Sequence, residues 1–185
     1  LRRQRQMCIR DRVVCLLFQY AGMSFVDFAH LKERNIKNGI LDYNRQKTGT
    51  PMRLEILDTA ELMRKELMGD KRPASGYLFP FLSGTKTGYE AYLEYNAALS
   101  RFNRNLKALK KAAGIASDVT SYTIRHSFAM ALKEQNVPIE MISELLGHKS
   151  IKTTQIYLRS FSLEKMTEVN STCFGCVYNY VSKVG

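Results

Sequence analysis

A helical repeat of apolar side chains constrains the fold of this chain more than any other feature. The apolar residues recur at intervals of three and four: Tyr92, Tyr95, Leu99, Phe102, Leu106, Leu109 and Ala113. This spacing places side chains on one face of an α-helix. It predicts a long helix from about Gly88 to Gly114, with the tyrosine-bearing face buried in the core.

Two shorter patterns precede this helix. Ser24 is a predicted N-cap for the helical segment SFVDFAHLK, with Asp27 as the carboxylate of a capping box. Residues 40–47 and 52–57 alternate with a period close to two, and Thr-Gly-Thr lies between them. This pattern is typical of a β-hairpin, with Lys47 at its tip.

Further helices are predicted over about 58–67, 120–135, 138–146, 150–157 and 158–169, whereas the apolar run 13–20 fits a helix or a strand. In the helix over 120–135, Ile124 and Phe128 belong to the expected apolar face, and Tyr122 and Arg125 to another. The fold class is therefore α+β, mainly α-helical, with a small β-hairpin in the N-terminal half.

Charge and composition narrow the function. Lys and Arg number 28 against 17 Asp and Glu, for a net charge of +11. Such a surface favours polyanions, either nucleic acid or an anionic membrane face. No apolar run reaches the ~18 residues that a membrane-spanning helix needs. Four cysteines form no disulfide framework, so we expect a reducing cytoplasm.

The two ends of the chain are interpreted separately. Residues 1–12 (LRRQRQMCIRDR) resemble translated sequencing-adapter sequence, so they are set aside from the fold prediction as an artefact or a disordered segment. Without them the chain is still clearly basic. Cys173 and Cys176 form a CFGC motif that supplies only two of four zinc ligands, so we read them as ordinary cysteines and expect no metal site.

Four residues have side chains suited to phosphate chemistry, and each also has a simpler interpretation. Lys47 is either a solvated cation or a projecting acid, and Arg125 either packs on Tyr122 or grips two phosphate oxygens. His148 follows Gly147 and is either a helix-end cation or a hydrogen-bond donor. A lone tyrosine such as Tyr157 is usually structural, because a phenol with a pKa of ~10 is a weak nucleophile at neutral pH.

The order of these residues resembles a known family. SYTIRHSFAMAL and then LLGHKSIKTTQIYL, with KTG upstream on the hairpin, resemble the catalytic domain of tyrosine recombinases, the phage-integrase family, over about 13–169. The wording of GMSFVDFAHL, YNRQKTG and SYTIRHS is most similar to integrases of Bacteroidetes mobile elements.

The resemblance implies a metal-free, cofactor-free transesterification on double-stranded DNA. By position, Tyr157 attacks the scissile phosphate and forms a 3′-phosphotyrosyl link, and Lys47 protonates the departing 5′-oxygen. Arg125 and His148 hold the non-bridging oxygens. Arg45, Lys149 and Lys152 are expected DNA contacts.

The chain departs from the family pattern at two positions. Ser24 stands where the family has its first arginine, and the loss of one phosphate-binding cation costs on the order of 10²–10³ in rate if nothing replaces it. Tyr122 stands at the histidine of HxxR, where its hydroxyl can still donate a hydrogen bond. His126 is not that histidine, and we interpret it as a supporting residue behind Arg125.

The resemblance also implies an organisation. We expect residues 13–169 to be the catalytic domain, without the family's N-terminal DNA-clamping domain, and residues 170–185 to be a tail that packs against a neighbouring protomer of a DNA-bound tetramer. Such a fragment should bind DNA weakly, through phosphates, in the bacterial nucleoid. Two alternatives remain at this point: a non-catalytic module with a helix-turn-helix over 138–158, and an inactive integrase remnant.

Overall fold

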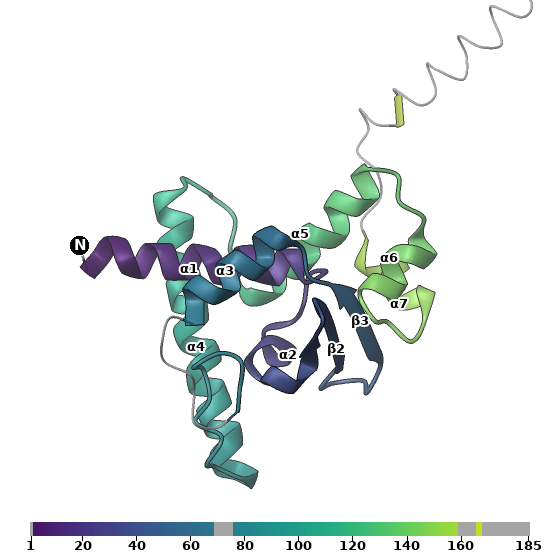
Figure 1. Cartoon of the computed structure of the whole chain (residues 1–185). Helices are drawn as coiled ribbons and strands as arrows, with labels where there is room; N and C mark the ends of the chain where they lie inside the picture. Colours follow the sequence, from purple (N-terminus) through teal and green to yellow (C-terminus); the bar gives the residue numbers. More distant parts are fainter. Residues whose placement is uncertain (1, 69–75, 159–165, 168–185) are drawn as a thin grey trace, which may run out of the picture.

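The computed structural model describes residues 2–68, 76–158 and 166–167, and within them the side chains of residues 2–10 and 157 are not described. The elements are α1 (Arg2–Gln19), α2 (Phe25–Ala29), the 3₁₀ turn η1 (Glu33–Asn35), β1 (Ile36–Lys37), β2 (Ile40–Asn44), β3 (Pro51–Glu55), α3 (Asp58–Met68), α4 (Gly88–Ala112), α5 (Ser121–Glu134), α6 (Ile139–Leu145) and α7 (Ile151–Tyr157). Figure 1 shows their order along the chain.

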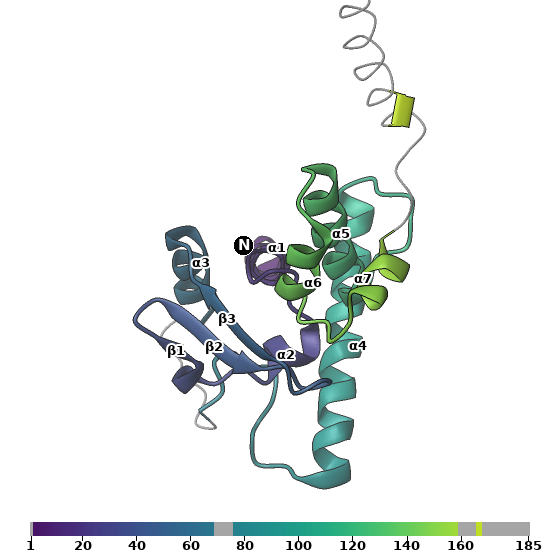
Figure 2. The ribbon, with the colours of Figure 1, turned by 90° about the vertical axis from the view of Figure 1, so that its right-hand side faces the viewer.

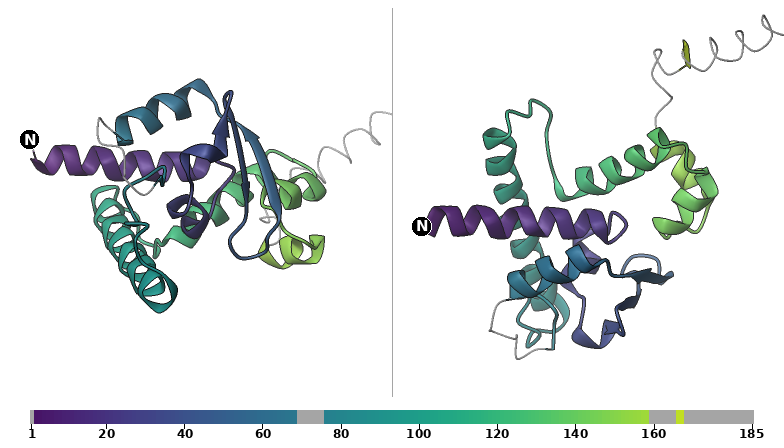
Figure 3. Two further views of the ribbon diagram at one scale, coloured as in Figure 1. Left: turned by 60° about the horizontal axis from the view of Figure 1, so that its bottom comes forward. Right: turned by 45° about the horizontal axis from the view of Figure 1, so that its top comes forward.

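Helix α1 lies in the middle of the molecule. It packs between α3 on one side and α5 on the other, and it also touches α4 (Figure 2). Leu16 and Leu17 are fully buried there, so the apolar run 13–20 resolves as helix. The same helix begins at Arg2 and thus includes the segment set aside above, and Arg12 Nε lies 2.6 Å from Glu66 of α3. The sheet and α3 lie on one side of α1, opposite α5 to α7 (Figure 3).

The predicted hairpin forms two strands of a three-stranded antiparallel sheet. Its order is β1-β2-β3, and Leu41 of β2 faces Leu54 of β3 across the ladder. Leu41 and Tyr43 are buried while the residues between them are exposed, which is the alternation expected of a strand with one covered face. The short strand β1 was not predicted. Lys47 lies in the turn between β2 and β3 and is exposed.

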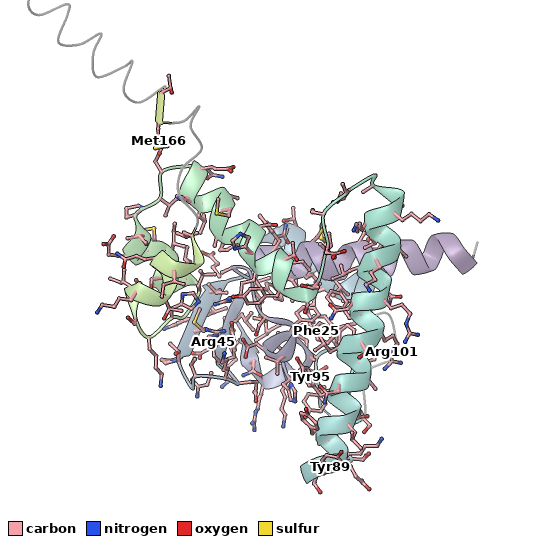
Figure 4. All side chains as sticks on the ribbon, turned by 180° about the vertical axis from the view of Figure 1, so that it is seen from behind. Phe25, Arg45, Tyr89, Tyr95, Arg101 and Met166 are labelled. Atoms are coloured by element: carbon pink, nitrogen blue, oxygen red, sulfur yellow. The ribbon has the colours of Figure 1, made fainter. Side chains whose placement is uncertain are left out.

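Helix α4 confirms the predicted length but only part of the predicted buried face. Phe102 and Leu106 are buried, and Phe25 of α2 stacks on Phe102 with ring centroids 4.6 Å apart. Tyr92, however, is 59% exposed, because the N-terminal end of α4 extends past the body of the molecule (Figure 4). Periodicity identifies a face of a helix, but the length of that face that is covered depends on its neighbours.

Helices α5 and α6 form a second, smaller core around Ala129, Ile142 and Leu146, and α7 packs against α6. The buried face of α5 contains Ile124, Arg125 and Ala129, so Arg125 lies inward rather than on the separate polar face that the sequence suggested. Helix α7 ends at Tyr157, where Leu158 adopts an extended backbone. Of the predicted helix over 158–169, only residues 166 and 167 are described as helical, and the tail with Cys173 and Cys176 lies outside the described residues. None of the described helices is long and apolar enough to cross a membrane.

Candidate phosphate-binding site

The candidate site is centred on a buried arginine. Arg125 is 5% exposed and lies in the second turn of α5. Its Nη1 donates to the Gly22 carbonyl at 3.0 Å, its Nη2 donates to the Leu146 carbonyl, and Nη2 lies 3.4 Å from His148 Nε2. Arg125 therefore connects the α1–α2 loop, the end of α6 and the α6–α7 turn.

His148 is held from two sides. An arginine only donates hydrogen bonds, so Nε2 of His148 accepts from Arg125, and Nδ1 then donates to Thr154 Oγ1 of α7 at 2.8 Å. Thr154 is fully buried. Desolvation, together with the charges of Arg125 and Arg45, lowers the pKa of His148 to about 4. The imidazole is therefore neutral at pH 7 in the unliganded site.

Gly147 makes this turn possible. Its φ is +62°, and a Cβ built there would lie 2.5 Å from Met52 Sδ and 2.7 Å from Arg45 Cδ. Both distances are shorter than real Cβ contacts, so a side chain at this position would have to displace the side chains of Met52 and Arg45. Glycine is required here by the backbone conformation and by the space.

A second arginine braces the same turn. Arg45 is 8% exposed, and its Nη1 donates to the carbonyls of Leu146 and Gly147, each at 3.0 Å. Its Nε lies 3.5 Å from Asp27 Oδ2. The sequence predicts Arg45 to contact DNA; in the structure it is buried, and it shares the Leu146 carbonyl with Arg125.

Asp27 fixes the base of the β2–β3 turn. It is 3% exposed, and it accepts hydrogen bonds from Ser24 Oγ at 2.5 Å and from the backbone N–H of Gln46 at 2.7 Å. Gln46 immediately precedes Lys47, so Asp27 anchors the segment that carries the candidate acid. Sequence reasoning assigned Asp27 only a capping role, and the local pattern contained no signal for its link to Arg45, which is distant in sequence.

The buried charges do not cancel. Among the described residues, the buried charged side chains are Asp27, Arg45 and Arg125. These residues thus comprise two buried guanidinium groups and one buried carboxylate, which lies beside Arg45. A buried excess of positive charge is costly, and an incoming anion relieves that cost. The site is electrostatically suited to one phosphate.

Lys47 and Tyr157 lie on segments next to the buried arginines. Lys47 follows Arg45 and Gln46 in the chain, and both of these residues contact Asp27. Tyr157 ends α7 one helical turn after Thr154, which bonds His148; the Tyr157 side chain lies outside the described residues. The structure thus brings Arg125 and His148 into contact and positions the backbones that carry the other two.

Ser24 and Tyr122 line a small cavity of about 170 Å³ beside Arg125. Tyr122 is 61% exposed in the first turn of α5. Of the other predicted residues, His126 is half-buried on α5, while Lys149 and Lys152 are exposed around the start of α7. Among the hydrogen bonds of the described residues, the Leu146 carbonyl accepts from two guanidinium groups, those of Arg45 and Arg125.

Comparison with known families decides the classification. Residues 3–164 match the model of the phage integrase family. The chain belongs to the phage integrase family. The match begins ten residues before the resemblance that the sequence suggested, consistent with the early start of α1.

The phage-integrase chain is similar to named recombinases over part of their length. It is 33% identical over 155 residues to the tyrosine recombinase XerA of Pyrococcus furiosus, covering 82% of this chain and 50% of that protein. Over 54 residues it is 52% identical to the tyrosine recombinase XerD of Lacticaseibacillus casei, covering 29% of this chain and 18% of that protein. The chain thus spans half, or less, of these curated relatives.

Solved structures share the fold. A crystal structure of XerA recombinase superposes with a TM-score of 0.59 at 21% identity, covering 89% of this chain and 62% of that one. The Tn1549 transposon integrase, in complex with a circular intermediate DNA, gives a TM-score of 0.62 at 16% identity, covering 86% of this chain and 57% of the integrase. At these identities the likeness concerns the fold alone.

Proposed function

We propose that this phage-integrase domain cleaves and rejoins DNA strands in site-specific recombination, through a covalent 3′-phosphotyrosyl intermediate. The observation that carries the proposal is the excess positive charge at a buried site, where Arg125 contacts His148 on a turn braced by Arg45. Family membership supplies the reaction class. It does not favour the alternative of a non-catalytic helix-turn-helix module.

In this mechanism the Tyr157 hydroxyl loses its proton to solvent, and its oxygen forms a bond to phosphorus as the bond to the 5′-oxygen breaks. Lys47 gives a proton to that departing oxygen. Arg125 stabilises the charge that grows on the non-bridging oxygens, which is the role expected of a preorganised cation in a desolvated site. Rejoining reverses the step: a 5′-hydroxyl attacks the phosphotyrosine and releases the tyrosine.

The protonation state of His148 sets what it can do. With a pKa of about 4 in the unliganded site, the neutral ring offers one N–H, and Thr154 accepts it. A phosphate placed beside the ring raises its affinity for a proton. His148 then donates from Nε2 to a non-bridging oxygen while Thr154 continues to hold Nδ1.

Trapping the covalent intermediate tests the proposal. The chain is incubated with a pool of nicked duplexes of randomised sequence, so that the cleaved strand can diffuse away, and is then denatured and resolved by gel electrophoresis. We expect a slowly migrating protein–DNA adduct, with the nucleotide on Tyr157 by peptide mass spectrometry. Tyr157→Phe should abolish it, because the attacking oxygen is removed.

Tyr89→Phe is the matched control, because Tyr89 is exposed at the far end of α4 (Figure 4) and should leave the adduct intact. An adduct that persists in Tyr157→Phe would assign the nucleophile to another residue. The absence of any adduct from the unmodified chain would support the inactive-remnant alternative. Assembly into a tetramer through the tail after Tyr157 and association with the bacterial nucleoid remain part of the proposal.

A further inference from the structure

A cavity of about 390 Å³ lies beside the β2–β3 turn, and the phosphate-binding site does not use it. It opens between α2, η1 and the end of β2. Its polar lining includes His30, Lys32, Arg34, Asn44, Gln46 and Tyr77. Gln46 directly precedes Lys47, so this cavity adjoins the turn that carries the candidate acid.

The charge of the cavity favours an anion. Lys32 and Arg34 line it, and Asp27 is the acidic residue among its lining residues. The Asp27 carboxylate already accepts hydrogen bonds from Ser24 and the Gln46 N–H, and it faces Arg45. Glu33 lies between the two cations in sequence, but it is exposed and does not line the cavity. The lining therefore keeps a positive excess.

The rim of the cavity is built rather than loose. Lys32 pairs with Tyr77 in an isolated antiparallel bridge, and its Nζ lies 5.4 Å from the centroid of the Tyr77 ring. Leu78 N–H donates to the Leu31 carbonyl at 2.7 Å. His30 donates from Nδ1 to the Val26 carbonyl at 2.8 Å, which fixes the ring at the edge of the cavity. The Lys32 ammonium, positioned beside the Tyr77 ring, is the kind of cationic donor that suits an oxyanion.

The position relative to Lys47 identifies the ligand. A DNA strand carries one phosphate about every 3.4 Å along the helix axis. A duplex whose scissile phosphate meets Lys47 has further backbone phosphates close to that residue, and Gln46 of the cavity lining is its chain neighbour. We infer that the cavity between α2, η1 and β2 is a second phosphate subsite, which binds a backbone phosphate of the same duplex through Lys32 and Arg34. This inference rests on the proposed function.

The salt dependence of DNA binding tests the subsite, because it counts the phosphates that a protein neutralises. Binding of a fluorescently labelled random-sequence duplex is measured by anisotropy over about 50–200 mM salt, with the full chain in the Tyr157→Phe background to prevent covalent capture. Arg34→Ala should make the slope of log K against log salt less negative by about 0.9. The ratio of the affinity at about 50 mM salt to that at about 200 mM salt should then be about 3.5 times smaller than in the parent chain.

Two variants separate a phosphate contact from other causes. Arg34→Lys keeps the charge and should keep the wild-type slope. Lys107→Ala removes an exposed cation on α4, outside the cavity lining, and should also leave the slope unchanged. An unchanged slope in both Arg34→Ala and Lys32→Ala overturns the inference, as does an equal change in Lys107→Ala, which reports net charge only.

A competitor and the adduct assay complete the test. If inorganic phosphate raises the melting temperature of the parent chain but not of Arg34→Ala, while the DNA slopes are identical, the cavity binds free phosphate and the inference is wrong. If the adduct forms but Arg34→Ala leaves the salt slope unchanged, the subsite inference is wrong and the recombinase proposal is supported. If Arg34→Ala changes the salt slope but no adduct forms, the subsite inference is supported and the recombinase proposal is wrong.

Discussion

Gly147→Ala tests the reasoning about the turn that holds His148. Two costs follow from the structure. A φ of +62° is unfavourable for an L-residue by about 1–2 kcal/mol. The new Cβ would also lie 2.5 Å from Met52 Sδ and 2.7 Å from Arg45 Cδ, and overpacking of this kind costs about 1–3 kcal/mol. The free energy of unfolding should fall by about 2–5 kcal/mol in total.

Gly114→Ala is the matched control. Gly114 has a φ of +66° and nothing within 4 Å of a built Cβ, so its substitution carries the conformational cost without the clash. Urea unfolding followed by circular dichroism should show Gly147→Ala less stable than Gly114→Ala by about 1–3 kcal/mol, with unchanged m-values. Gly147→Ala should also slow adduct formation, because the shift reaches Arg45 and His148, whereas Gly114→Ala should not. Equal losses of stability, within about 0.5 kcal/mol, would refute the steric argument.

The remaining predictions concern His148 and Ser24. Folding lowers the pKa of His148 to about 4, so the unfolded state binds a proton more readily than the folded state. The contribution of the neutral His148 ring to stability is therefore fully present above about pH 6.5 and is lost as the pH falls toward 4. After allowance for solvent screening at this half-buried ring, the loss is about 1–2 kcal/mol; His148→Gln should remove this part of the pH profile, while His126→Gln should retain it. A profile unchanged in His148→Gln would contradict the assignment. Ser24→Arg should preserve or raise the rate of adduct formation, because a cavity of about 170 Å³ and the Asp27 carboxylate lie beside Ser24; a sharp loss of rate would show that the site is built around another residue.

Local patterns predicted most of the secondary structure. The interval of three and four identified α4, the alternation around Thr48 to Thr50 identified β2 and β3, and the helix predicted over 120–135 corresponds to α5. The extent of burial was harder to predict. Tyr92 fits the apolar period of α4 but is mostly exposed, since none of the described elements covers it at that end of the helix.

The same division applies to the site. The order of Lys47, Arg125, His148 and Tyr157 was enough to indicate the family, because motif spacing is a property of the chain. Sequence did not predict that Arg45 is buried or that Asp27 connects to it, because these contacts join residues far apart along the chain.

The sequence by itself determined which residue types are available for phosphate chemistry and which helices and strands carry them, because these depend on composition and on short-range periodicity. Only the tertiary structure decided that two arginines share the carbonyl at the end of α6, and that Asp27 is the one buried carboxylate beside them in the part of the chain that the structure describes. The physical reason is that the charge of a buried site depends on which charged side chains are buried together, and this depends on how distant segments of the chain pack.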